Sequence, residues 1–154
     1  MAHERSLIRV FYFSAVILSL FTGCAHVNES SPDMELAAAV FSGNPGYPSQ
    51  AFVLMEGRTL VAKRFFQGKE KQRSFDLKES DFEELRALFH SAFNELKSVN
   101  PVQGIAGGTN IRIVLKGDQS NPAILKNYAE RLYKLESLPA LNKKLESLVP
   151  RSFW

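Results

Sequence analysis

The thiol of Cys24 is the most reactive side chain in the sequence. It is the only cysteine among 154 residues, so no internal disulfide can form. An unmodified thiol is a liability in an oxidising compartment, because its thiolate form reacts with electrophiles. Cys24 stands directly after Gly23, at the end of an apolar run. The segment in front of Cys24 therefore decides what chemistry the thiol can meet.

The residues before Cys24 have the layout of an export signal. Residues 1–9 are polar, with a net positive charge from Arg5 and Arg9 against Glu4, and positive charge stays on the cytoplasmic side of a membrane. Residues 10–22 are uncharged and mostly large and apolar, which fits a signal peptide. The run is shorter than the ~20 apolar residues of a membrane span. An uncleaved anchor, an ordinary secretory leader and a buried strand are the alternatives.

The stretch Leu20-Phe21-Thr22-Gly23-Cys24 resembles the lipobox of bacterial lipoproteins, in which an apolar residue and two small residues precede the cysteine. Phe21 stands where that family prefers Leu. The resemblance implies that Cys24 receives a diacylglyceryl group and that cleavage after Gly23 removes the signal peptide, residues 1–23. It also implies acylation of the new amine by a fatty acid such as palmitate.

A chain processed in this way is exported and held in the cell envelope by membrane lipid, its first expected partner. Ala25 follows the cysteine in place of Asp. By analogy with Gram-negative lipoproteins, this favours the outer membrane, facing the periplasm. Residues 24–34 then form the lipidated cysteine and a polar, flexible tether that includes His26. A single small domain, residues 35–154, follows.

A second candidate site is the glycine-rich stretch at residues 104–110. A phosphate-binding P-loop needs Lys and Ser/Thr after its last glycine, at the start of a helix. This stretch leads into an expected strand instead, so its amides lack a helix dipole. We interpret it as a flexible connection and as the candidate binding loop for a partner, since loops carry function more often than the framework does. Its candidate residues are Gly104, Gly107, Gly108, Thr109 and Asn110.

No pattern in the sequence predicts catalysis, a metal or a cofactor. After removal of the leader only His26 and His90 remain, so a catalytic triad would depend on His90 alone. Three acids, Asp81, Glu83 and Glu84, stand in the first turn of an expected helix, where negative charge interacts favourably with the helix dipole. The spacing of a zinc or calcium site is absent from the sequence. We therefore expect no enzyme, no metal and no cofactor.

The elements that must position these residues alternate between strands and helices. The pattern of residues 36–41 indicates a strand or a single helical turn. Residues 50–56 and 59–66 are expected to form a hairpin, and further strands are expected at residues 72–77 and 111–116. A helix capped by Ser80 and Glu83 should run to about Lys97, and a last helix capped by Ser137 should carry Pro139 in its first turn. Residues 122–135 are compatible with a helix or with a strand plus loop.

This order predicts an α+β fold. We expect a small antiparallel sheet of four to five strands with two or three helices packed on one face, after an N-terminal signal helix. Trp154 is expected to dock on the domain or to contact a membrane interface. The net charge of +3 comes from interspersed acidic and basic residues, unlike the basic patch of a nucleic-acid-binding protein.

The leading hypothesis is a non-catalytic envelope lipoprotein whose domain binds another protein or an envelope component. An alternative is an inhibitor of a peptidase or a lysozyme. Phe41-Ser42-Gly43 resembles the strand ending in Ser-Gly that opens bacterial inhibitors of metallopeptidases. The sequence specifies neither the partner nor the oligomeric state.

Replacing Cys24 by alanine should abolish lipidation. We expect cells fed radioactive palmitate to label the wild-type chain and His26→Ala, but not Cys24→Ala, because the thiol is the expected acceptor of the lipid. The measurement is fluorography of the immunoprecipitated protein. Equal labelling of all three chains, or of none, would contradict the lipoprotein interpretation.

Overall fold

The computed structural model describes residues 34–43, 46–100, 107–129 and 133–154. The expected signal peptide, Gly23, Cys24 and all but the last residue of the expected tether lie outside these ranges, as does Gly104. Among the described residues, no helix has the length and apolar character needed to cross a membrane.

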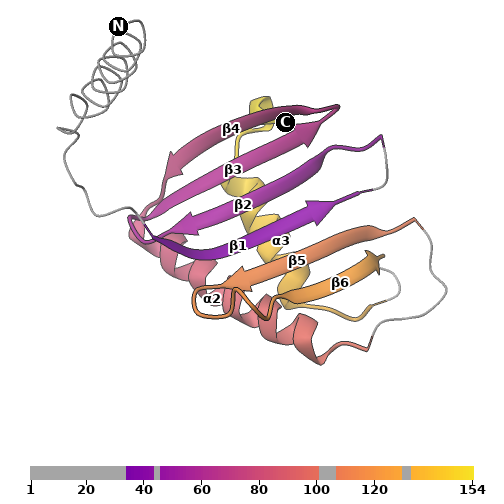
Figure 1. Cartoon of the computed structure of the whole chain (residues 1–154). Coiled ribbons are helices and arrows are strands. Elements are labelled where there is room, and N and C mark those ends of the chain that lie inside the picture. Colours follow the sequence, from indigo (N-terminus) through magenta and orange to yellow (C-terminus); the bar gives the residue numbers. More distant parts are fainter. Residues whose placement is uncertain (1–33, 44–45, 101–106, 130–132) are drawn as a thin grey trace, which may run out of the picture. The chain divides into compact units, whose positions relative to one another are not determined.

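The framework is a six-stranded sheet with the strand order β4-β3-β2-β1-β5-β6 (Figure 1). Every pairing is antiparallel. The first strand lies inside the sheet, between β2 and β5, so pairing distant in sequence joins the two halves of the domain. The strands are β1 (Glu35–Ser42), β2 (Ser49–Met55), β3 (Thr59–Phe66), β4 (Lys69–Asp76), β5 (Thr109–Leu115) and β6 (Ala123–Tyr128).

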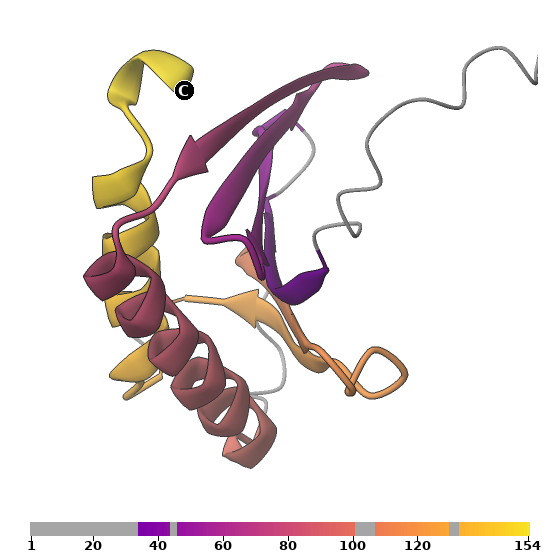
Figure 2. The ribbon, with the colours of Figure 1, turned by 90° about the vertical axis from the view of Figure 1, so that its left-hand side faces the viewer.

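Two α-helices, α2 (Glu79–Ser98) and α3 (Ser137–Leu148), lie on one side of the sheet (Figure 2). A 3-10 turn, η3 (Arg151–Phe153), follows α3. The α+β fold class is therefore confirmed, but the sheet has six strands where four or five were expected. The additional strand is β6. It lies in residues 122–135, the segment for which the sequence was compatible with either a helix or a strand plus loop.

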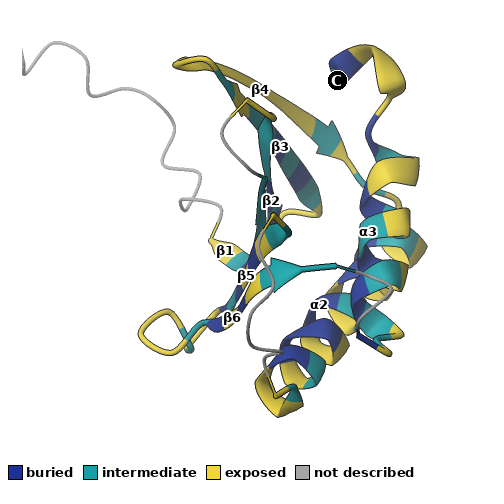
Figure 3. Ribbon diagram, turned by 90° about the vertical axis from the view of Figure 1, so that its right-hand side faces the viewer, coloured by how far each residue is buried: buried dark blue, intermediate teal, exposed yellow. Residues whose placement is uncertain are grey.

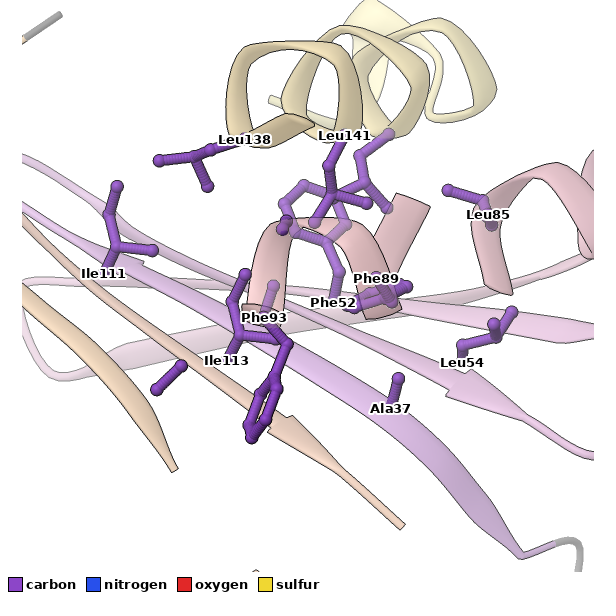
Figure 4. Close-up of a cluster of buried hydrophobic side chains, with 14 of the residues drawn as sticks. Ala37, Phe52, Leu54, Leu85, Phe89, Phe93, Ile111, Ile113, Leu138 and Leu141 are labelled. Carbon is purple, nitrogen blue, oxygen red and sulfur yellow. The ribbon is translucent and has the colours of Figure 1, made fainter. Parts of the chain in front are cut away.

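The helix-facing side of the sheet is apolar because alternate residues of each strand point to the same face. Phe52 and Leu54 of β2 and Ile111 and Ile113 of β5 are buried on this side. Figure 4 shows these side chains meeting those of the two helices. The predicted stripe of α2 is confirmed, with buried Phe82, Leu85, Phe89, Ala92, Phe93 and Leu96.

Local turn chemistry explains the hairpin between β3 and β4. Only Gln67 and Gly68 separate the two strands, and both have positive φ angles, 49° and 74°. Two-residue hairpin loops favour this left-handed backbone, because its twist matches that of the strands. The predicted cap of α2, in contrast, is wrong. The helix begins at Glu79, one residue before Ser80, and its N-cap residue Lys78 makes no side-chain capping bond.

An ion cluster joins α3 to α2. The ammonium group of Lys144 donates a hydrogen bond to Asp81 Oδ1 at 2.8 Å and a second one to Glu84 Oε2. The Lys144 side chain is 18% exposed, so solvent screens this cluster less than a surface pair. The two carboxylates accept these hydrogen bonds and raise the pKa of Lys144 above its ordinary value of 10.5.

Lys144→Met should destabilise the fold in a pH-dependent way. We expect the free energy of unfolding at pH 7 to fall by about 1 kcal/mol, because the substitution removes the partner of two carboxylates. Since the pKa is raised on folding, the contribution of Lys144 is complete below pH 10.5 and is lost as the pH rises through the folded-state pKa. Denaturant unfolding of wild type and variant from pH 7 upward measures this.

Lys143→Met, at the exposed neighbouring lysine, is the matched control and should change stability little. A difference between wild type and Lys144→Met that stays constant as the pH rises past 10.5 would contradict the assigned cluster.

Candidate functional site

A groove runs between α3 and the helix-facing side of the sheet, where β1, β2, β5 and β6 end or begin. We call it the α3 groove. It consists of three adjoining hollows: a central one of about 340 Å³, a loop-side one of about 470 Å³ and a C-terminal one of about 490 Å³. The side chain of Gln50 lines all three hollows, so they form one continuous depression.

Strand alternation and helix periodicity place these side chains on the groove. On β2, Gln50 lies on the same face as Phe52 and Leu54, since every second residue shares a face. On α3, Leu138, Asn142 and Glu146 recur every four residues, which aligns them along one side of the helix. Figure 3 shows the sheet and α3 from the side, with the C-terminal turn beyond α3.

The central hollow has an apolar floor and a polar rim. Ile111 and Leu138, each 1% exposed, form the floor together with Phe41 and Tyr128. Leu138 reaches it from α3 and Ile111 from β5 (Figure 4). On the rim, the Asn142 amide donates a hydrogen bond to Glu146 Oε1 at 3.0 Å. Few polar groups around an apolar floor are typical of a ligand site.

The glycine-rich stretch predicted as a binding loop reaches this groove. Gly107, Gly108 and Thr109 line the loop-side hollow, and Thr109 also lines the central one. Gly108 is required by close packing, because a Cβ atom there would lie 2.3 Å from the carbonyl carbon of Asn127. The described part of the stretch therefore packs tightly against β6.

Asn110 has a structural role in this region. Its side-chain Oδ1 accepts a hydrogen bond from the main-chain N–H of Asn127 at 3.0 Å, which ties β5 to β6. It does not line the hollows among the described residues. Its main-chain oxygen accepts a bond from the Ser42 hydroxyl at 3.4 Å. Of Phe41-Ser42-Gly43, the stretch that suggested an inhibitor, Phe41 and Gly43 line the loop-side hollow.

The C-terminal residues close the other end of the groove. The Trp154 ring packs edge-on against Phe52, with 5.6 Å between ring centroids, and lines the C-terminal hollow. Lys71 Nζ donates a hydrogen bond to the main-chain oxygen of Phe153 at 2.7 Å, and Arg64 donates one to that of Trp154. Trp154 therefore docks on the domain, as one of the two sequence-based expectations had it.

The carboxylate of Glu95 fixes the start of α3. Its Oε1 accepts hydrogen bonds from the N–H groups of Glu136 and Ser137, at 2.7 and 3.2 Å. Its Oε2 accepts one from the N–H of Leu138 at 2.9 Å. The predicted cap Ser137 is therefore wrong, because the side chain of Glu95, from the last turn of α2, takes that role. The position of the groove wall depends on this contact.

The groove offers little for catalysis. Of the described residues that line it, Glu146 is the only acid and none is a histidine. His90 lies exposed on α2. Within the described residues, no group of three or more His, Cys, Asp and Glu could hold a metal ion.

Glu95→Ala should loosen the start of α3. We expect the free energy of unfolding to fall by about 1–2 kcal/mol, because three amides lose their acceptor. Glu95→Gln, which keeps one acceptor oxygen, should lose less. Chemical denaturation measures both, with Asn94→Ala on the exposed side of α2 as the control. Equal stability of Glu95→Ala and Asn94→Ala would rule out the assigned capping role.

Comparison of the sequence with protein-family models gives no match, and the comparison with curated proteins gives none either.

Proposed function

We propose that the chain is a non-catalytic lipoprotein of the cell envelope whose domain binds a short extended segment of another envelope protein. The observation that carries this proposal is the α3 groove. Its floor is apolar, its rim presents the amides of Gln50 and Asn142, and its only acid is Glu146 among the described lining residues. Such a surface is suited to binding, whereas Glu146 has no histidine, cysteine or second carboxylate beside it among the described lining residues to make up a catalytic set.

The dimensions of the groove suit a peptide. From Pro139 to Ser147 the helix α3 rises about 12 Å, at ~1.5 Å per residue. An extended chain covers this length with about four residues, at ~3.3 Å each. A side-chain amide both donates and accepts hydrogen bonds, so Gln50 and Asn142 can pair with the peptide main chain. An apolar side chain of the segment then fills the central hollow.

Membrane attachment completes the proposal. A diacylglyceryl group on Cys24 holds the chain at a membrane surface, and the tether at residues 24–34 spans at most about 40 Å when fully extended. The groove therefore stays within reach of proteins in or near the same membrane leaflet. This part of the proposal depends on the lipobox resemblance at residues 20–24.

Site-specific photo-crosslinking in intact cells tests the groove. Gln50 and Ser49 are adjacent on β2 but point to opposite faces of the sheet. We expect benzoylphenylalanine at position 50 to form a covalent adduct with an envelope protein, and the same group at position 49 to form none. The adducts are detected by immunoblotting and mapped by mass spectrometry.

The adduct should map to one short apolar segment of the partner. Benzoylphenylalanine at position 142 is a second probe in the groove and should give an adduct with the same segment. This second adduct should disappear when Gln50→Trp fills the hollow. Adducts of equal yield from positions 49 and 50, or none from either, would refute the binding proposal.

A further inference from the structure

We infer that the segment bound by the α3 groove is acidic at one end, with its carboxylates held between Lys143 and Arg151 beside Trp154. This inference rests on the proposed peptide-binding function and adds the chemical class and the direction of the ligand. It follows from the uneven distribution of charge along the groove.

The C-terminal hollow carries two exposed cations. Lys143 and Arg151 both line it, and within the described residues neither forms a salt bridge. Glu146 lies in the same hollow, and its carboxylate already accepts a hydrogen bond from Asn142. An arginine guanidinium matches the two oxygens of a carboxylate in a bidentate pair. The hollow therefore has free capacity for anions.

A second layer of cations lies behind this hollow. Arg64 and Lys71 project from the helix-facing side of β3 and β4 to the main-chain oxygens of the C-terminal residues. Arg73 lies on the same face of β4, with its guanidinium 5.5 Å from the centroid of the Phe75 ring. Charges within about 8 Å of each other are only partly screened at physiological salt. Arg64 and Lys71 therefore add positive charge next to Phe153 and Trp154, although both already donate hydrogen bonds there.

The opposite end of the groove is neutral. None of the described residues that line the loop-side hollow is charged, and they include Tyr47, Pro48, Gly107 and Gly108. Between the two ends lies the central hollow, which has an apolar floor of Phe41, Ile111 and Leu138 and shares Lys143 and Glu146 with the C-terminal hollow. Charged side chains are therefore absent from the loop-side hollow, begin in the central hollow with Lys143 and Glu146, and are joined by Arg151 at the C-terminal end. A complementary ligand has an uncharged end, an apolar side chain in the middle and carboxylates at the end next to Arg151.

Peptide binding to the purified full-length lipoprotein in detergent tests the inference. The probes are capped octapeptides with a central Leu in a Ser/Gly background, in three sets that carry two Asp, two Lys or two further Ser on one side of the Leu. Trp154 is the only tryptophan of the chain and lines the C-terminal hollow, so its emission reports occupancy.

We expect the Asp peptides to bind about tenfold more tightly than the Ser peptides at low salt, and the Lys peptides to bind least. The preference for Asp should shrink as NaCl is raised, because salt screens exposed charges. It should also be larger when the Asp pair lies on one side of the Leu than on the other, because only one end of the groove is cationic.

Paired substitutions separate local from general attraction. Lys143→Gln with Arg151→Gln should abolish the preference, so that the ratio of Asp-peptide to Ser-peptide affinity measured on this variant falls to about one. Arg86→Gln with Lys134→Gln changes the net charge equally at exposed cations that do not line the described groove, and should preserve the preference.

Three other outcomes would overturn the inference. Equal affinity for Asp and Ser peptides would show that the cationic end does not select the ligand. A preference that survives the Lys143→Gln and Arg151→Gln pair would place the attraction elsewhere. Absence of binding by all three sets would also overturn it, while the adducts from position 50 decide the underlying binding function independently.

Discussion

The carboxylate of Glu95 is the contact on which the arrangement of α3 depends. A helix of twelve residues is marginal in isolation, and the first N–H groups of any helix lack intrahelical acceptors. Glu95, in the last turn of α2, accepts hydrogen bonds from three main-chain N–H groups at the start of α3. Leu138, Leu141 and Leu145 then fix the buried side of α3 on the core. The groove is what remains between this anchored helix and the ends of the strands.

Local patterns in the sequence were sufficient for most elements. The strand at residues 59–66 was predicted with its observed ends, because the glycine-containing turns on either side mark where it begins and ends. The segment that became β6 was ambiguous, because Ile124, Tyr128, Leu132 and Leu135 also fit a helical spacing. Pairing with β5 decides it. The predicted cap of α3 was wrong because its start also depends on a long-range contact. The acceptor for the first N–H groups of α3 is Glu95, some forty residues earlier in the chain.

The candidate site was predictable only in part. Glycines before a strand indicated the loop, and Gly107, Gly108 and Thr109 do line the groove. Gln50 and the α3 residues were missed, because a single amide in a strand and a polar residue on a helix carry no motif. Their proximity follows from the strand order, in which β1 separates β2 from β5. That order depends on long-range pairing, which local periodicity does not contain.

The shallow groove and the proposed lipid anchor have complementary energetic roles. Burying one Leu-sized side chain in the central hollow contributes about 1.5–3 kcal/mol, and exposed ion pairs at the C-terminal end add about 0–1 kcal/mol each. These terms give weak binding once the entropy of association is subtracted. In the proposed arrangement, confinement of both partners near one membrane raises their effective concentration to the millimolar range. A weak, directional groove is then sufficient for function, and release of the segment stays fast.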